Sequence, residues 1–99
     1  MGFFEVTSRE IRSKAAALGE LNGQFKGKEN ELENKEVELT SMWEGEAKSA
    51  FHMAFSRDKS QMDAFSSLIE QYVSALLEIA QRYEEAERRA AELAASRSY

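Results

Sequence analysis

Residues 51–93, FHMAFSRDKSQMDAFSSLIEQYVSALLEIAQRYEEAERRAAEL, carry the pattern that decides the fold. Along this stretch apolar residues recur in alternating steps of four and three, a spacing that places them on one face of a helix. This apolar stripe consists of Phe51, Phe55, Asp58, Met62, Phe65, Ile69, Tyr72, Leu76, Ile79, Tyr83, Ala86, Ala90 and Leu93, with Asp58 as its one polar member. The pattern predicts a coiled-coil-like helix over about residues 46–94, whose apolar face is wide enough for more than one neighbour.

A thinner stripe precedes it and predicts a first helix over about residues 8–40. Its members recur every seven residues and are Ile11, Leu18, Phe25, Leu32 and Leu39. Thr7 followed by Glu10 fits a capping box at the start of this helix. Because the stripe is narrow, we expect this helix to depend strongly on its neighbours.

The two stripes do not continue one another. They are offset by about two residues, or roughly 200° around a helix, so the chain must reset its phase between them. Ser41 with Glu44 fits a second capping box, and Gly45 tolerates backbone angles that other residues resist. We therefore expect a short turn at about residues 41–45 and an all-α fold: a helix-turn-helix hairpin of two long antiparallel helices in a single domain, residues 1–99, with a frayed tail at 95–99.

One hairpin of this length buries too little apolar surface to be very stable alone. We therefore expect two hairpins to dimerise into a four-helix bundle. The expected shared core comprises Ile11, Leu18, Phe25, Leu32, Leu39, Phe51, Phe55, Met62, Phe65, Ile69, Tyr72, Leu76 and Ile79. A partly exposed or ion-paired Asp58 would interrupt this core and help to set its register.

Composition excludes several classes of function. The chain has 99 residues, no proline, no cysteine and a net charge of −5. Without cysteine there is no disulfide and no thiolate metal site, and without a basic patch nucleic acid is not an expected partner. His52 is the only histidine, and no serine has the His and Asp partners that would activate it. We expect no metal, no cofactor and no enzymatic activity.

The N-terminal stretch, residues 1–6, has neither the basic nor the apolar region of a Sec signal peptide. No apolar run is long enough to span a bilayer. Stable membrane insertion is therefore not expected, and any export would follow a route other than the classical one.

Two short motifs stand out against this helical background. The expected turn contains Trp43-Glu44-Gly45 near mid-chain, an aromatic residue, Phe51, follows it, and Tyr83 and Glu87 form a Y-x-x-x-E pattern near the C-terminus. In a chain of about 100 residues with two long helices, this arrangement resembles the WXG100 (ESAT-6-like) family over essentially the whole sequence.

The resemblance implies a function. WXG100 proteins are non-enzymatic helical hairpins that dimerise, often as homodimers, and leave the cell folded through a type VII secretion system driven by an FtsK/SpoIIIE-type ATPase. By this resemblance the chain is a secreted effector, a virulence factor or a component of the secretion system. Trp43 and Gly45 would then form the WxG turn, and Tyr83 with Glu87 the export signal.

Helix geometry separates these two motifs within one chain. Tyr83 lies about 57 Å along the second helix from Gly45, at 1.5 Å per residue. In an antiparallel pair of hairpins, Trp43 of one chain would lie near Tyr83 and Glu87 of its partner. A symmetric dimer would then carry two composite sites, one at each end.

Other interpretations of these residues stay open. Trp43 can be an apolar plug at the end of the bundle, Tyr83 a core aromatic and Glu87 a solvated charge. Gly19, Gly23 and Gly27, at steps of four, either weaken a solvated helix face or form a groove in which the helices of a dimer cross closely.

Three alternatives for the whole protein also stay open. The chain could be the escort or partner of a larger type VII toxin, and, whatever its role, its dimer partner could be a related small helical protein instead of an identical chain. It could be a cytoplasmic structural coiled-coil adaptor in which the WxG is coincidental. A membrane-active amphipathic protein is the third alternative, and the acidic balance counts against it.

Overall fold

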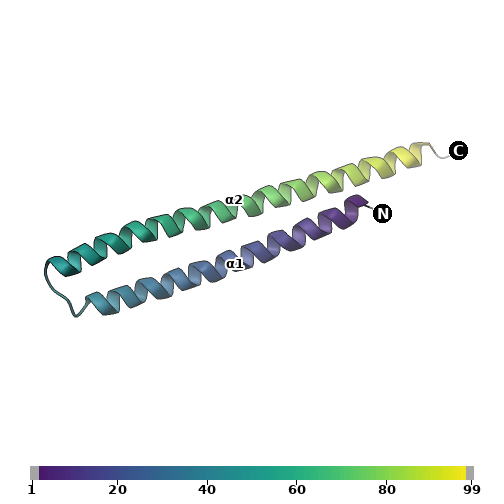
Figure 1. Cartoon of the computed structure of the whole chain (residues 1–99). Helices are drawn as coiled ribbons and strands as arrows, with labels where there is room; N and C mark the ends of the chain where they lie inside the picture. Colours follow the sequence, from purple (N-terminus) through teal and green to yellow (C-terminus); the bar gives the residue numbers. More distant parts are fainter. Residues whose placement is uncertain (1–2, 98–99) are drawn as a thin grey trace. The chain divides into compact units, whose positions relative to one another are not determined.

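The computed structural model describes the backbone of residues 3–97 and the side chains of residues 6–97. Two helices account for nearly all of it: α1 (Phe3–Thr40) and α2 (Glu46–Ser96) (Figure 1). No strand occurs among the residues described. The fold class is the predicted one, all-α, with two long helices forming a hairpin.

Both ends of the helical region differ from the sequence-based bounds. Helix α1 begins at Phe3 rather than near residue 8, so Thr7 lies inside the helix and does not cap it. No proline or glycine stands between residues 3 and 7 to stop the helix from extending backward. Helix α2 continues to Ser96, and the Arg97 amide donates to the Ala94 carbonyl at 3.2 Å. The rest of the expected frayed tail, residues 98–99, lies outside the described residues.

The connection between the helices is a capped turn at residues 41–45. The hydroxyls of Thr40 and Ser41 donate to the carbonyls of Glu36 and Glu38 at 2.8 and 2.7 Å. They therefore serve the C-terminal end of α1, where carbonyls lack amide partners. Ser41 does not act as the expected N-terminal cap of α2. The Gly45 carbonyl instead accepts the Ser49 amide at 3.3 Å, and Gly45 has a φ of +85°.

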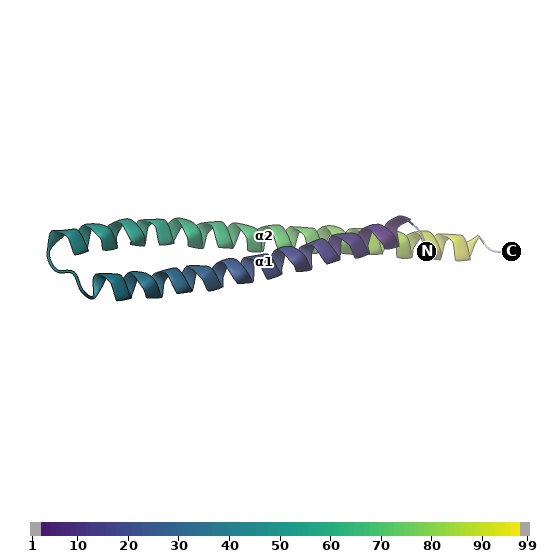
Figure 2. The same cartoon turned by 60° about the horizontal axis from the view of Figure 1, so that its bottom comes forward.

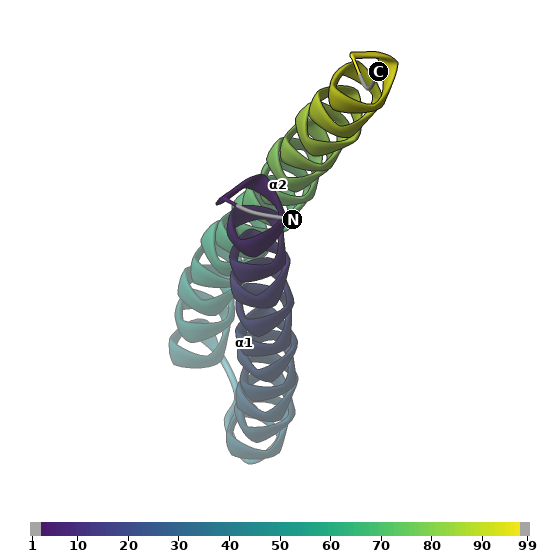
Figure 3. The same ribbon diagram turned by 90° about the vertical axis from the view of Figure 1, so that its right-hand side faces the viewer.

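The chain divides into two compact units, each containing a segment of both helices. The first unit combines residues 1–19 with 71–99, and the second comprises residues 20–70. Figures 2 and 3 show the same two helices from other directions.

In the second unit the two helical segments meet through polar pairs. Asn22 and Ser66 are both buried, and the Ser66 hydroxyl donates to the Asn22 side-chain oxygen at 2.9 Å. Seven residues further along α1, Glu29 lies 3.5 Å from the Lys59 ammonium, which also contacts Asp63 at 3.2 Å. These pairs join rising residue numbers in α1 to falling numbers in α2, so the segments run antiparallel.

The same pattern continues toward the turn. Glu36 is 6% exposed, and its carboxylate lies 3.0 Å from the His52 ring nitrogen. One aromatic contact accompanies the polar pairs, with the rings of Phe25 and Phe65 edge-to-face at 5.4 Å. No buried side-chain nitrogen or oxygen in the described part of the chain lacks a hydrogen-bond partner. Hydrogen bonds therefore compensate the burial of these polar atoms, as a protein interior requires.

The first unit packs on small residues. Ala15 on α1 and Ala80 on α2 are 1% and 0% exposed, and they are the fully buried hydrophobic residues of the part described. Ser8 is also buried, while Ile11 and Leu76 are half-buried. Small side chains permit a close approach of the two helical segments.

The buried positions of α1 form what we call the inner column. Its members recur every seven residues, have exposed fractions between 1% and 8%, and are Ser8, Ala15, Asn22, Glu29 and Glu36. This column was not predicted from the sequence, because the large apolar residues that define the predicted stripe of α1 lie three positions later. The sequence does contain a signal for this column, namely a heptad repeat of small and polar residues beside the apolar stripe.

Many members of the predicted bundle core are consequently half-exposed in the single chain. Phe65 is 52% exposed, Tyr72 and Leu32 are 50% exposed, and Leu39, Ile79 and Phe51 are 42%, 41% and 37% exposed. The other predicted core residues are half-buried, namely Ile11, Leu18, Phe25, Phe55, Met62, Ile69 and Leu76. Asp58 is exposed. A core built from the whole set stays a prediction about a dimer.

Gly45 and Gly23 provide a matched test of the turn. Replacing Gly45 by Ala forces a Cβ into a left-handed backbone conformation and should lower the free energy of unfolding by about 1–2 kcal/mol. In Gly23→Ala the added Cβ meets no atom within 4 Å. This substitution should raise the free energy of unfolding by roughly 0.5–1 kcal/mol, since alanine favours a helix interior. Thermal unfolding followed by circular dichroism measures both. A Gly23→Ala protein that unfolds more easily would instead favour a close-contact glycine groove in the dimer.

Candidate functional site

The WxG turn places an aromatic pair beside the start of α2. Trp43 is half-buried, and its ring lies edge-to-face against Phe51 with centroids 5.5 Å apart and planes at 78°. Such a pair contributes about 0.5–1.5 kcal/mol beyond its area burial. Phe51, which follows the motif in the sequence, therefore holds the Trp43 ring against α2.

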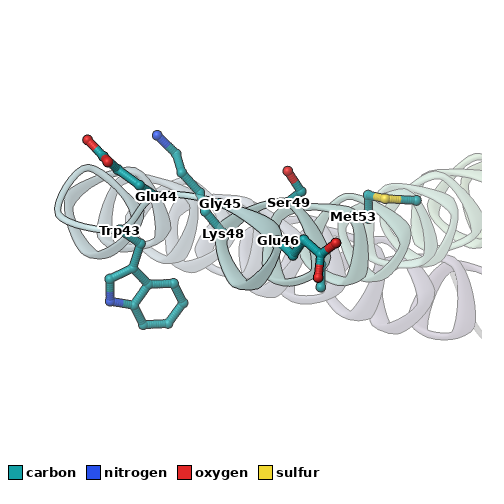
Figure 4. Close-up of a pocket in the computed structure, with 8 residues that line it drawn as sticks. Trp43, Glu44, Gly45, Glu46, Lys48, Ser49 and Met53 are labelled. Carbon is teal, nitrogen blue, oxygen red and sulfur yellow. The ribbon is translucent and has the colours of Figure 1, made fainter.

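A surface hollow adjoins this pair. Figure 4 shows the Trp43 ring on one side of the chain and Glu44 and Lys48 extending from the other. Met53 also lines the hollow and is 70% exposed, and Met42 in the turn is 79% exposed. The lining is Trp43, Glu44, Gly45, Glu46, Lys48, Ser49, Ala50 and Met53. Flexible methionines beside an aromatic ring suit the binding of apolar side chains of another protein.

Tyr83 and Glu87 belong to the first unit, whereas Trp43 and Gly45 belong to the second. Tyr83 and Glu87 lie one turn apart on α2 and are half-buried, as are the three residues between them. From Arg88 to Arg97 every residue is exposed. The Y-x-x-x-E motif therefore occupies the last covered turn of α2.

A two-pronged ion pair ties this motif to α1. The Arg12 guanidinium donates to both carboxylate oxygens of Glu84 at 2.6 and 2.8 Å. The hydrogen bond from Arg12 is the main cause that lowers the pKa of Glu84, and the Ser8 hydroxyl contributes in the same direction. Arg12 was not among the site residues predicted from the sequence, because no pattern within α1 links it to a residue 72 positions away.

A second charged cluster lies around Lys59 in the other unit. Lys59 contacts Glu29, Glu33 and Asp63. The hydrogen bond between Glu29 and Asp63, followed by burial, raises the pKa of Glu29. The same hydrogen bond is the main cause that lowers the pKa of Asp63. The cluster joins the two helical segments through Lys59 of α2 and the two glutamates of α1.

The described residues do not contain a group of three or more His, Asp or Glu side chains arranged to hold a metal ion. His52 contacts Glu36, which is a pair and not a ligand set. Within residues 3–97, no helix is long and apolar enough to cross a membrane.

Comparison with protein families identifies this arrangement. The family model described as "Proteins of 100 residues with WXG" matches residues 4–88, which include Trp43, Gly45, Tyr83 and Glu87. The chain belongs to the WXG100 family. No curated protein and no solved structure shows significant similarity to it.

Membership of the WXG100 family defines the broad class of function. The chain is a small helical substrate of type VII secretion, and proteins of this family are not known as enzymes. Members of the family typically form dimers. The large apolar side chains that this WXG100 chain leaves half-exposed are consistent with that behaviour.

The Arg12–Glu84 pair predicts a pH dependence. Because the folded-state pKa of Glu84 is lowered, its contribution to stability is present above the pKa of an unfolded glutamate and is lost as the pH falls through the folded-state value. Arg12→Ala should raise the pKa of Glu84 toward its ordinary range. An NMR titration of the Glu84 side chain measures the change, with Lys26→Ala as control. An unchanged Glu84 pKa in Arg12→Ala would contradict the prediction.

Proposed function

We propose that this WXG100 chain leaves the cell folded, as a homodimer, and acts by protein–protein recognition as an effector or as a component of the secretion system. The observation that carries the proposal is that the family match spans both motifs, the WxG turn and the Tyr83/Glu87 pair. In this proposal Tyr83 and Glu87 form the export signal read by the FtsK/SpoIIIE-type ATPase.

Burial supports a dimer. The fully buried hydrophobic residues of the described chain are two alanines, whereas Phe65 and Tyr72 are about half-exposed. Phe51, Phe65, Tyr72, Ile79 and Leu93 are spaced by multiples of seven residues and are all exposed, so they line one side of α2. Exposed apolar side chains gathered along one side of a helix in this way, here interrupted by Asp58, mark an interaction site. A second copy of the chain offers the same stripe in return.

Geometry supports a composite site in that dimer. The hollow beside Trp43 has an exposed Met53 and a mixed-charge rim of Glu44, Glu46 and Lys48. Antiparallel association of two hairpins would bring the Tyr83/Glu87 turn of one chain to this end of the other. The WxG turn would then complete the export signal of the partner chain.

Dimerisation can be tested on the exposed side of α2. Ile79→Asp places a charge in the proposed interface and should weaken the dimer by at least about thirtyfold, from the roughly 2 kcal/mol lost with a buried isoleucine. Gln81→Asp adds the same charge two residues away, about 200° around the helix, and should leave the dimer intact. Light scattering across a dilution series measures both. A wild-type protein that is a folded monomer at micromolar concentration would refute the dimer.

Export can be tested in the native host by immunoblotting medium and lysate together. Wild type should appear in the medium, whereas Tyr83→Ala and Glu87→Ala should stay inside at normal cellular levels because the signal is lost. Glu85→Ala removes a neighbouring carboxylate outside the motif pair and should be exported. If the wild-type protein stays inside cells that are secreting and have not lysed, the export proposal fails and the adaptor alternative takes its place.

A further inference from the structure

The export motif lies in the part of α2 that α1 still covers. Residues 83–87 are half-buried, whereas the following residues to Arg97 are exposed. Figures 1 and 3 show the C-terminal turns of α2, in yellow, running on past the purple start of α1. Ser8, which is 4% exposed, and Arg12 are the α1 residues that interact with Glu84 inside the motif.

The contact from Arg12 is geometrically specific. A guanidinium that donates to both oxygens of one carboxylate fixes the direction of that carboxylate as well as its distance. Glu84 directly follows Tyr83 in the helix, so fixing Glu84 also fixes the rotation and position of the helical turn that carries Tyr83 and Glu87.

We propose that Arg12 of α1 is a positioning residue for the export signal, so that the surface read by the secretion machinery spans both helices. This inference rests on the proposed function of Tyr83 and Glu87. It adds that the sequence Tyr83–Glu87 is insufficient by itself and requires the ion pair of Glu84 with Arg12.

One reason for such a pair is that it determines which carboxylates of the motif turn are presented to a receptor. The motif turn contains three carboxylates, Glu84, Glu85 and Glu87, of which the Y-x-x-x-E pattern uses the last. Arg12 neutralises Glu84 and directs it toward α1. A receptor with a cationic group beside an apolar pocket would then meet the Tyr83 ring and the Glu87 charge in one defined arrangement.

The other reason is that the pair keeps the motif turn ordered before a receptor binds to it. A helix that loses its lateral contact frays and must be ordered again when it binds, which weakens association. The turn at 83–87 is the last covered part of α2, so loss of the contact with α1 exposes it to this effect.

The chain provides a matched control. Lys26 and Glu70 form an ion pair between α1 and α2, as Arg12 and Glu84 do, two heptads later in α1 and two heptads earlier in α2. The two pairs are similarly exposed, with side-chain fractions of 53% and 55% against 45% and 42%. Because Lys26–Glu70 lies outside the motif, its loss reports only on the general contribution of such a pair.

The test compares Arg12→Ala, Lys26→Ala, Tyr83→Ala and the charge-swapped double variant Arg12→Glu with Glu84→Arg in the native host. We expect the exported fraction of Arg12→Ala to fall by up to about fivefold, which is the largest change that loss of one exposed ion pair ordinarily produces in an equilibrium. Lys26→Ala should be exported like wild type, and the double variant should recover export because the pair is restored with reversed charges.

Hydrogen exchange on the purified proteins gives a readout that does not depend on secretion. The amides of residues 83–87 should exchange about fivefold faster in Arg12→Ala than in the wild-type protein, and at the wild-type rate in Lys26→Ala. Normal export of Arg12→Ala with retention of Tyr83→Ala would overturn the role of Arg12 while leaving the export signal in place. Equal defects in Arg12→Ala and Lys26→Ala, or a double variant that is not rescued, would also overturn it. Export of Tyr83→Ala at the wild-type level would instead refute the proposed function itself.

Discussion

The contact between the two helices uses small and polar side chains, and the remaining properties of the molecule depend on this. The inner column of α1 contains a serine, two glutamates, an asparagine and one alanine. Across from it, α2 presents Ser66, Lys59 and His52. Since this contact covers the large apolar residues only in part, much of their surface stays available for another molecule.

Polar pairing also specifies how the helices meet. Asn22 with Ser66, Glu29 with Lys59 and Glu36 with His52 are satisfied only in one antiparallel register. A slip of one turn would leave buried polar groups without partners, which costs far more than such pairs contribute when formed. The polar pairs therefore provide specificity of alignment, and apolar burial with a partner would supply the larger part of the stability.

The two sequence motifs occupy structurally different positions. The WxG turn is an exposed corner, where Phe51 supports the Trp43 ring and two methionines are open to solvent. The Tyr83/Glu87 turn is partly covered and tied to α1 through Arg12. Neither position resembles a catalytic pocket, and both suit recognition by another protein, in agreement with the WXG100 family.

The sequence by itself determined the helical content, the interruption near Gly45 and the two motifs, because heptad spacing and the special backbone freedom of glycine are local properties. It did not predict the start of α1 at Phe3, because an apparent capping box is only a competing local preference. Only the tertiary structure decided which face of each helix turns inward. That choice depends on pairs such as Asn22–Ser66 and Arg12–Glu84, whose members lie 44 and 72 positions apart, so that no local spacing in the chain links one member to the other.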